Sequence, residues 1–527
     1  AALLARVTGC PVKYRLSRSD DMVQTGKRHD FFNTYHIGFD DSGLIKGADL
    51  MVAGRCGYSP DLSDAIVDRA MFHACNAYYL DQARVVGHRC KTHTVSNTAF
   101  RGFGGPQGMM IIEQAMDDIA RHLGKDPLDI RKLNLFGPGR DVSHYGQTIE
   151  QQVLPELIAQ LERSSAYRQR RQEIIALNAR NPVLKRGLAL TPVQFGISFT
   201  AKHLNQAGAL VHIYTDGSIQ VNHGGTEMGQ GLYIKVAQVV ATAFQVDVAR
   251  VKVSATRTDK VPNTSPTAAS SGSDLNGMAA LDACEKILGG LTAFASSHWN
   301  VPEEHVRFHA NQVHIGDHCL SWEDFIQTAY MHRISLSSSG FYATPKIHYD
   351  HDAGQGRPFL YYTNSAACSE VVVDTLTGEY RVLRTDILHD AGRSLNPAID
   401  MGQIEGGFIQ GMGWLTTEEL VYSAEGRLLT TGPATYKIPA VSDCPPDLRV
   451  ALLKDSPNHE ATVFHSKAVG EPPFMLGISV WSALRDAVSS LSDYRFSPPL
   501  DTPATPERVL NAVTETRRWV NQQENGQ

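Results

Sequence analysis

Four glycine-rich stretches hold most of the side chains that could do chemistry on a large polar ligand. They are TAFRGFGGPQG at 98–108, GGTEMGQG at 224–231, NTSPTAASSGSD at 263–274 and SKAVGEPPFMLG at 466–477. Glycine and other small residues leave the main chain bare, so backbone amides can come close to a phosphate or a heterocycle. In the first stretch one arginine stands between two phenylalanines. The pattern predicts a phosphate-bearing ligand that is held mainly by backbone.

The usual nucleotide motifs are absent from these stretches. A dinucleotide fingerprint needs a third glycine where Gln107 stands, and Pro106 removes an amide that phosphates could use. No lysine follows Gly229, so the second stretch is not a P-loop. Gln230 offers both donors and acceptors there, which suits a heterocycle or an oxo ligand. For the third stretch, a polar surface loop is the alternative.

Glu471 is the candidate general base of the fourth stretch. It precedes Pro472 and Pro473, and the residue before a proline favours an extended backbone, so we expect a carboxylate held off the following helix. A positioned carboxylate can take a proton from a reacting group. The alternative is an acid near a helix N-terminus, where the helix dipole favours it. The motif by itself does not separate the two.

Composition and charge exclude several classes of partner. The chain has 527 residues, of which 42% are hydrophobic and 20% charged, and its net charge is −6. This length predicts two or more lobes, and this charge predicts no nucleic-acid partner and no membrane partner. No apolar run reaches the length of a membrane span, and no secretory signal opens the chain. The eight cysteines lack C-x-x-C spacing, so we expect buried thiols in a reducing, cytoplasmic compartment.

Hydrophobic patterning predicts an α+β protein with mixed sheets and packed helices. Alternating residues predict a strand at 10–18 and hairpins that turn at 41–43, at 216–217 and near Gly378. Helical spacing predicts helices over 109–124, 126–135, 232–246 and 474–491. The histidines of 298–320 are irregularly spaced, which favours a strand–turn excursion over a metal site.

The weakest core patterning lies between two better patterned regions. We therefore expect three parts: the C-terminal part of a first lobe over 1–137, a helical linker over 138–186 and a second lobe over 187–527. Inside the linker, the basic run RQRRQ at 168–172 is expected to be a solvated helix face rather than a nucleic-acid patch.

Six motifs occur in the order in which they occur in the xanthine dehydrogenase family of molybdenum hydroxylases. They are NTAFRGFGGPQG, GGTEMGQG, SPTAAS, SLNPAID with GQIEGGFIQG, GPATYKIPA and SKAVGEPP. The chain resembles the large molybdopterin-binding portion of that family over nearly its whole length. The resemblance implies a two-lobed fold of the xanthine dehydrogenase and aldehyde oxidase type, with molybdenum-molybdopterin as its cofactor.

The resemblance implies oxidation of hypoxanthine or xanthine to urate with oxygen from water. Glu471 would be the catalytic base, taking the proton from a molybdenum-bound hydroxyl. Phe103 would lie flat on the purine, with Phe199 meeting it edge-on. Arg69 would stabilise negative charge on one purine oxygen, and Thr200 would hydrogen-bond a substrate oxygen. Without the family, Arg69 in IVDRAMFHA would be read as a surface arginine near a helix.

The same resemblance implies the surroundings of the cofactor. Gln230, Ser270 and Gln403 would hold the pterin and its phosphate. The backbones of Arg101 and Ala269 would lie near the molybdenum. The full implied set is Phe100, Arg101, Gly102, Met228, Gly229, Gln230, Ala268, Ala269, Ser270, Ser273, Gln403 and Gly470.

Electrons in this family leave through [2Fe–2S] clusters and FAD to NAD. We expect these centres on a partner subunit or on a region outside this sequence, in a dimer of heterodimers. The family's molybdenum domain also begins upstream of this sequence, so we expect part of the site to be missing from it. Two alternatives stay open: an oxidase of aldehydes or other N-heterocycles, and a folded, non-catalytic fragment without cofactor. Arg69 favours purines, because aldehyde oxidases generally lack it.

Overall fold

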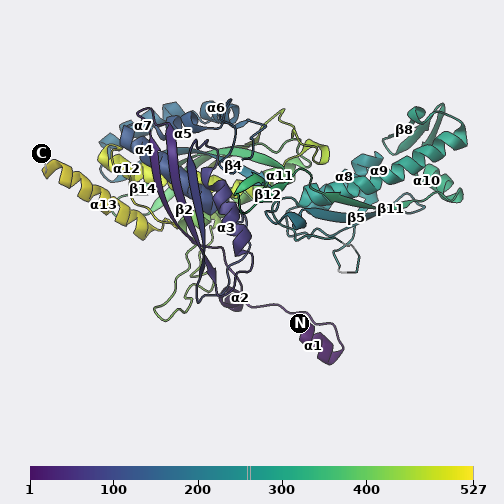
Figure 1. The fold of residues 1–527 in the computed structure, drawn as a ribbon, viewed down its shortest axis with the longest axis horizontal. Coiled ribbons are helices and arrows are strands. Elements are labelled where there is room, and N and C mark those ends of the chain that lie inside the picture. Colours follow the sequence, from purple (N-terminus) through teal and green to yellow (C-terminus); the bar gives the residue numbers. More distant parts are fainter. Residues whose placement is uncertain (258, 261–262, 526–527) are drawn as a thin grey trace.

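A computed structural model describes residues 1–257, 259–260 and 263–525 (Figure 1). Helices and mixed sheets form a large body, and a smaller unit made by 206–343 projects from one side of it. The predicted α+β class with mixed sheets and packed helices is confirmed. In the described part of the chain, no helix combines the length and the apolar character that crossing a bilayer requires.

A four-stranded sheet with the order β16-β15-β14-β4 forms the centre of the body. Its strands are β4 (Leu184–Ile197), β14 (Tyr361–Asp374), β15 (Tyr380–His389) and β16 (Asp447–Leu452). β14 runs antiparallel to both β4 and β15, and the predicted turn near Gly378 joins β14 to β15. Helix α12 (Ile478–Ser489) packs so closely on β4 that Gly187 leaves no room for a side chain: a Cβ there would lie 1.9 Å from the Ala483 carbonyl oxygen.

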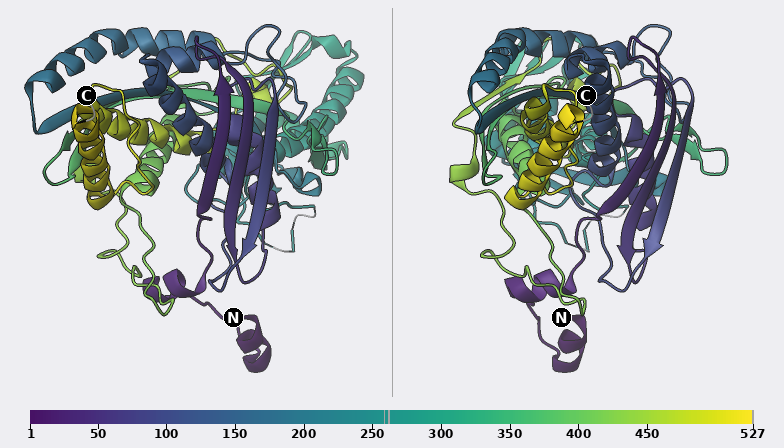
Figure 2. Two further views of the ribbon diagram at one scale, coloured as in Figure 1. Left: turned by 60° about the vertical axis from the view of Figure 1, so that its left-hand side comes forward. Right: turned by 90° about the vertical axis from the view of Figure 1, so that its left-hand side faces the viewer.

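A second sheet, with the order β1-β2-β3, stands beside the helices of the body (Figure 2). It contains β1 (Phe31–Phe39), β2 (Ile45–Gly57) and β3 (Ala83–Lys91). The hairpin predicted at 41–43 joins β1 to β2. Helix α3 (Ser63–Phe72) crosses between the parallel strands β2 and β3. Helix α4 (Gly105–Leu123) packs on α3 and ends, as predicted, before Gly124 in the left-handed conformation.

The projecting unit has its own hydrophobic core. Its main sheet, with the order β11-β5-β6-β7, contains β5 (Gln206–Ile213), β6 (Ile219–His223), β7 (Val251–Val253) and β11 (Ser337–Ala343). Helices α8 (Leu232–Phe244) and α9 (Gly272–Trp299) pack on this sheet. The predicted excursion is confirmed: β8 (Val306–His309), β9 (Gln312–Ile315) and β10 (His318–Ser321) form a small antiparallel sheet.

The remaining elements complete the chain. The helices are α1 (Ala2–Thr8), α2 (Arg18–Gln24), α5 (Pro127–Asn134), α6 (Leu154–Ser164), α7 (Tyr167–Arg180), α10 (Trp322–Met331), α11 (Pro397–Thr416) and α13 (Pro506–Asn525). A short hairpin pairs β12 (His348–Asp350) with β13 (Gln355–Arg357), and 3₁₀ turns include η7 (Pro472–Gly477). The strand predicted at 10–18 is wrong, since residues 11–17 have no regular secondary structure. Helix α2 begins at Arg18, and Ser17 caps it by accepting a hydrogen bond from the Asp20 amide.

The predicted solvated face at 168–172 is wrong for two of its three arginines. Arg170 and Arg171 are buried, and Arg170 pairs with Glu370 at 2.7 Å and with Asp386 at 3.2 Å. Arg171 pairs with Asp486 of α12. These carboxylates attract the helix onto the central sheet, so helical patterning alone misplaced its charged face. Helices α6 and α7 thus pack into the body, and the division of the chain at 138–186 stays a prediction.

Candidate active site

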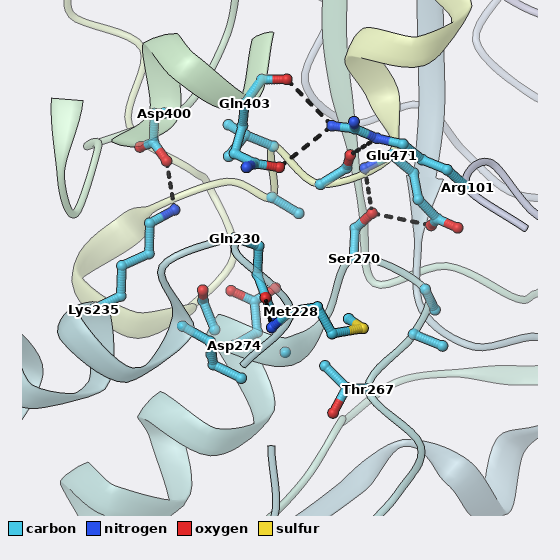
Figure 3. A pocket seen from close by; sticks show the side chains of 18 of the residues that line it. Arg101, Met228, Gln230, Lys235, Thr267, Ser270, Asp274, Asp400, Gln403 and Glu471 are labelled. Atoms are coloured by element: carbon cyan, nitrogen blue, oxygen red, sulfur yellow. Dashed lines mark hydrogen bonds and ion pairs between the residues drawn. The ribbon is translucent and has the colours of Figure 1, made fainter. Parts of the chain in front are cut away.

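A cavity of about 550 Å³ lies where the four glycine-rich stretches meet (Figure 3). Segments far apart in the sequence line it together. Their lining residues are Ala99, Phe100, Arg101, Phe103, Met228, Gln230, Leu232, Lys235, Thr267, Ala268, Ala269, Ser270, Gly272, Ser273, Asp274, Leu395, Asp400, Gln403, Gln410 and 466–471. The structure therefore brings together most of the residues expected around the cofactor.

Arg101 ties three of these segments to one another. Its Nε donates to the Gly470 carbonyl oxygen at 2.6 Å, and its Nη1 donates to Gln410 Oε1 at 3.1 Å. Its Nη2 donates to the Gln403 carbonyl oxygen at 3.2 Å. Burial lowers the pKa of the guanidinium below its ordinary value, and nearby Glu471 opposes that shift. The arginine is thus a partly buried cation that fixes the first stretch against α11 and the fourth stretch.

The two phenylalanines beside Arg101 each meet another arginine. The guanidinium of Arg28 lies 4.5 Å from the centre of the Phe100 ring, and that of Arg69 lies 6.0 Å from the centre of the Phe103 ring. An arginine over an aromatic face is attracted to the negative potential of the ring. Burial lowers the pKa of Arg28 to about 9. Sequence reasoning missed Arg28, because no local pattern links it to Phe100.

Glu471 is held by three hydrogen bonds at the wall of the cavity. The Gly102 amide donates to its Oε1 at 3.0 Å, and the Ser270 hydroxyl donates to its Oε2 at 3.0 Å. The Glu471 amide donates to the Ser270 hydroxyl oxygen at 2.7 Å. The carboxylate is therefore buried, oriented and accessible from the cavity.

The expected extended backbone at Glu471 is wrong. Its φ of −95° and ψ of −39° lie in the helical region, and it caps η7. The Phe474 amide donates to the Glu471 carbonyl oxygen at 3.0 Å, and the bond to Ser270 holds the other side of the residue. These hydrogen bonds outweigh the preference for an extended backbone at a residue that precedes proline.

Backbone in the left-handed region shapes the wall around this carboxylate. Phe103, Ala269 and Ser270 have φ values of 49°, 57° and 58°. This conformation is uncommon for residues other than glycine, and such strain gathers at functional sites. It lets Ser270 present its hydroxyl to Glu471.

Phe103 and Phe199 form a tilted pair, and the edge-on contact of Phe199 with a purine stays a prediction. Their ring centres are 5.2 Å apart and the planes meet at 57°. Together with Ile66 and Ala269 they make a small apolar cluster beside the cavity. Of the pair, Phe103 lines the cavity and Phe199 lies behind it.

Arg69 is fully buried in α3, so its alternative placement at the surface is wrong. Its Nη1 donates to the Gly196 carbonyl oxygen at 2.8 Å, and its Nη2 donates to that of Ser198. Its Nε has no hydrogen-bond partner in the structure. Burial lowers the pKa of this arginine to about 10. Arg69 does not line the cavity but sits next to Phe103.

Four other expected residues contribute less directly. Thr200 donates its hydroxyl to the Ala65 carbonyl oxygen at 3.2 Å and lies outside the cavity lining. Gly102 and Gly229 also lie outside that lining, and Gly102 acts through its amide. Gln230 uses its amide within its own loop, accepting from the Met228 amide and donating to the Thr226 carbonyl oxygen.

Two lysines in the cavity lining were missed from the sequence. Lys235, in the first turns of α8, pairs with Asp400 of α11 at 2.5 Å. Lys467 pairs with Asp390, and neither side chain is exposed. A single lysine inside the apolar run LYIKVAQVV was a signal that could have found the first pair.

The cavity has the chemistry that a pterin with a phosphate requires. Helix α9 begins here without a side-chain cap, since the Ser271 hydroxyl donates instead to the Ala268 carbonyl oxygen. An uncapped helix N-terminus favours an anion. Glutamine amides at 230, 403 and 410 and hydroxyls at 267, 270 and 273 can match the edges of a heterocycle. At Gly470 a Cβ would lie 3.1 Å from Ser270 Oγ, so a side chain there would crowd this wall.

Among the described residues, one group of side chains that could ligate a metal lies outside the cavity. Glu150, His459 and Glu460 lie within mutual reach of one ion. Arg357 pairs with both carboxylates at 3.0 and 2.7 Å, and Lys346 pairs with Glu460 at 2.9 Å. Because these cations already compensate the carboxylates, the group is an ion-pair network that joins surface loops.

Comparison with known proteins identifies the family. Two sequence-family profiles, each described as a molybdopterin cofactor-binding domain, match residues 1–135 and 160–445. The chain belongs to the molybdopterin cofactor-binding domain family. Its cofactor is therefore molybdopterin with molybdenum, and the cavity is the place in this molybdopterin-binding region whose chemistry fits it.

Similar curated proteins are xanthine dehydrogenases. The xanthine dehydrogenase/oxidase of Gallus gallus is 47% identical over 518 residues, which are 98% of this chain and 37% of that protein. Xanthine dehydrogenase 1 of Arabidopsis thaliana is 46% identical over 515 residues, covering 95% of this chain and 36% of that protein. This molybdopterin-binding region thus spans little more than a third of the length of these relatives.

Solved structures with the same fold come from bacterial oxidoreductases. The reconstituted CO dehydrogenase from Oligotropha carboxidovorans gives a TM-score of 0.87 at 20% identity, over 99% of this chain and 65% of that one. Quinoline 2-oxidoreductase from Pseudomonas putida 86 gives a TM-score of 0.85 at 23% identity, over 97% and 66%. The fold implied by the sequence motifs is confirmed by this likeness.

Proposed function

We propose that the protein containing this chain is a xanthine dehydrogenase-type molybdenum hydroxylase that oxidises hypoxanthine and xanthine to urate. Each oxidation adds one oxygen from water to a ring carbon and releases two electrons and two protons. The observation that carries the proposal is the Glu471 carboxylate, held between the Gly102 amide and the Ser270 hydroxyl at the wall of the cavity.

The molybdenum cofactor, when bound, supplies the metal that activates water-derived oxygen and accepts the electron pair. Residues 100–103, the start of α9 and residues 466–471 would hold it, and Arg101, Ser270 and Gln403 would offer it polar groups. Glu471 takes a proton at its carboxylate. Because two donors already fix both oxygens, the carboxylate needs little reorganisation when it does so.

Phe103 and Arg69 support a planar, electron-poor substrate. A purine on the face of Phe103 gains stacking area in the apolar cluster with Phe199. The positive charge of Arg69, next to that ring, stabilises negative charge that develops on a purine oxygen. Thr200 would reach substrate by giving up its bond to Ala65, which at 3.2 Å is long for a hydroxyl donor.

The centres that remove the electrons are proposed to lie outside this chain. Of its cysteines, Cys56, Cys75, Cys284 and Cys368 are buried, and burial raises the pKa of the Cys75 and Cys368 thiols to about 12. Such thiols are poor thiolate ligands. We propose [2Fe–2S] clusters and FAD on a partner subunit or on another region of the same protein, with NAD as acceptor in a dimer of heterodimers.

The test is a comparison of substrates and of one arginine variant. The full protein is assayed with xanthine and with an aromatic aldehyde, using an artificial electron acceptor, after its molybdenum content is measured by elemental mass spectrometry. We expect Arg69→Met to lower kcat/KM for xanthine at least tenfold more than for the aldehyde, at equal molybdenum content.

The other outcomes decide between the remaining functions. Xanthine turnover that survives Arg69→Met, or a preference of the wild type for the aldehyde, would favour an aldehyde or N-heterocycle oxidase. Protein that folds but carries no molybdenum would favour a non-catalytic fragment.

A further inference from the structure

Tyr361 joins an acid in the cavity to the segment that carries Glu471. The Tyr361 hydroxyl donates to Asp274 Oδ2 at 2.7 Å, and the Ala468 amide donates to the Tyr361 oxygen at 3.0 Å. Asp274 lies in the first turn of α9, and Ala468 precedes Glu471 by three residues. Both Asp274 and Ala468 line the cavity.

The segment before Glu471 is held at nearly every residue. The Lys467 amide donates to the Ala391 carbonyl oxygen at 2.9 Å, and Thr363 donates to the Ala468 carbonyl oxygen at 3.0 Å. Arg101 donates to the Gly470 carbonyl oxygen at 2.6 Å. Among these anchors, the bond at the Ala468 amide differs because its acceptor is the hydroxyl of Tyr361, whose proton is committed to a carboxylate.

The charge state of that carboxylate decides how strong the chain of bonds is. A hydrogen bond to an ionised group is roughly twice as strong as a bond between neutral groups, and chained bonds polarise one another. With Asp274 ionised, the Tyr361 O–H points firmly at Oδ2 and its oxygen lone pairs face the Ala468 amide. With Asp274 protonated, the acid can donate to the Tyr361 oxygen and compete with that amide.

The groups around Asp274 set the pH at which its carboxyl ionises close to neutral. Burial raises the pKa of Asp274 to about 7, while the bond from Tyr361 and the charge of Lys235 oppose the shift. Lys235 is itself paired with Asp400, so its charge is partly compensated. Tyr342 faces Asp274 from β11, and its own pKa is raised by burial and by that carboxylate. Two further cations line the cavity: Lys467, which is paired with Asp390, and Arg101, which donates to the Gly470 carbonyl oxygen.

We propose that Asp274 is a positioning residue whose ionised carboxylate, through Tyr361, holds the Ala468 amide and thereby the backbone that carries Glu471. This inference rests on the proposed function, in which Glu471 is the catalytic base. Protonation of Asp274 loosens the segment. How firmly the backbone of Glu471 is held therefore depends on pH through Asp274, which is neither the base nor a substrate ligand.

Hydrogen exchange at the Ala468 amide tests the proposal directly. The full, cofactor-loaded protein is exchanged between pH 6 and pH 8, each rate is corrected for the intrinsic pH dependence of exchange, and the amide is resolved by peptide fragmentation. A group with a pKa near 7 is roughly nine-tenths ionised at pH 8 and roughly one-tenth ionised at pH 6. We therefore expect about tenfold higher protection at pH 8 in the wild type, following that ionised fraction.

Two variants and one control separate the chain of bonds from general loosening. Asp274→Asn, which cannot ionise, should show the same protection within twofold at both pH values. Tyr361→Phe should lose protection at both. Thr363→Val removes the other bond to Ala468, and it should lower protection while keeping the pH dependence. Wild-type protection that does not change with pH, or an unchanged pH dependence in Asp274→Asn, would overturn the proposal.

The pH profile of kcat provides the link to function. An inflection near pH 7 in the wild type should vanish in Asp274→Asn, at equal molybdenum content. Exchange is measured without turnover, so it reports on Asp274 even if the substrate assigned above is wrong. If exchange behaves as expected but the profile does not, the segment responds to Asp274 without controlling the base, and the positioning role fails.

Discussion

The backbone amide of Gly102 donates a 3.0 Å hydrogen bond to the Oε1 atom of Glu471, across 369 positions of the sequence. The bond joins the loop between β3 and α4, which carries Arg101, to the carboxylate at the start of η7. Together with the Ser270 hydroxyl, which donates to Oε2 at 3.0 Å, this bond fixes the orientation of the Glu471 carboxylate. Four predictions concern this site and the fold around it.

Glu471→Gln should lower kcat by a factor of about 10² to 10⁴, the range that a general base contributes. The glutamine Oε1 can still accept from the Gly102 amide, so the segment and the cofactor should stay in place. Single-turnover oxidation of substrate gives the rate, and elemental mass spectrometry gives molybdenum per chain. Turnover within tenfold of the wild type at equal molybdenum would show that another group takes the proton.

Gly108→Ala should destabilise the fold, although alanine is the better helix former. A Cβ at Gly108 of α4 would lie 2.1 Å from the Ala70 carbonyl oxygen of α3, so the two helices would have to separate. Overpacking of this kind costs about 1–3 kcal/mol or more. Gly289→Ala in α9 is the matched control: no atom lies within 4 Å, so we expect a gain of about 0.5–1 kcal/mol. Chemical denaturation of both variants gives the two values, and equal effects would contradict the argument.

Arg131→Met should be the more damaging of two ion-pair deletions. Arg131 pairs with Glu113 and with Asp117, each at 2.8 Å, inside the body. Removing the cation leaves the buried Glu113 carboxylate without an ion-pair partner, although Asp117 keeps Arg485 at 3.5 Å, and breaking a buried pair costs about 3–5 kcal/mol. Lys286→Met removes an exposed pair with Asp282 and should cost about 1 kcal/mol or less. Unfolding midpoints compare the two, and a smaller loss for Arg131→Met would refute the assignment.

Asp274→Asn should change how stability depends on pH. Because the folded-state pKa of Asp274 is raised to about 7, its contribution to stability is fully present below the unfolded pKa near 4 and is lost as pH rises toward 7. The asparagine of Asp274→Asn does not ionise, so this loss of stability with rising pH does not occur in the variant. Its Tm relative to the wild type should therefore rise between pH 5 and pH 8. A Tm difference that is constant over this range would mean that the pKa of Asp274 is not raised in the fold, because the carboxyl would then be ionised in both the folded and the unfolded chain.

Much of the local structure follows from patterns in the sequence. The turns at 41–43, at 216–217 and near Gly378 were found because glycine accepts positive φ at such turns, as at Gly43 with a φ of 94°. Helices α4 and α8 follow from apolar spacing, and α4 also from the glycine that ends it. The motifs also found most of the cavity lining, since backbone close to a ligand requires small residues at particular positions.

Charged residues were the main source of error. Arg69, Arg170 and Arg171 were expected at the surface when only local sequence was considered, and all three are buried. Each is compensated by groups distant in sequence: backbone carbonyls of β4 and its end for Arg69, and carboxylates on β14, β15 and α12 for the others. A one-dimensional pattern reports the polarity of a side chain but not the partner that permits its burial.

What the sequence by itself determined is the family, the class of fold and the set of glycine-rich loops, because these depend on residue types at fixed local spacing. What only the tertiary structure decided is how Glu471 is held, where Arg69 points, and that Asp274, Tyr361 and Ala468 form one chain of bonds. These relationships join residues that lie tens to hundreds of positions apart. Their geometry is set by the packing of β14, α9 and the Ser466–Glu471 segment, and hydrogen bonds form only when that packing brings donor and acceptor to about 3 Å.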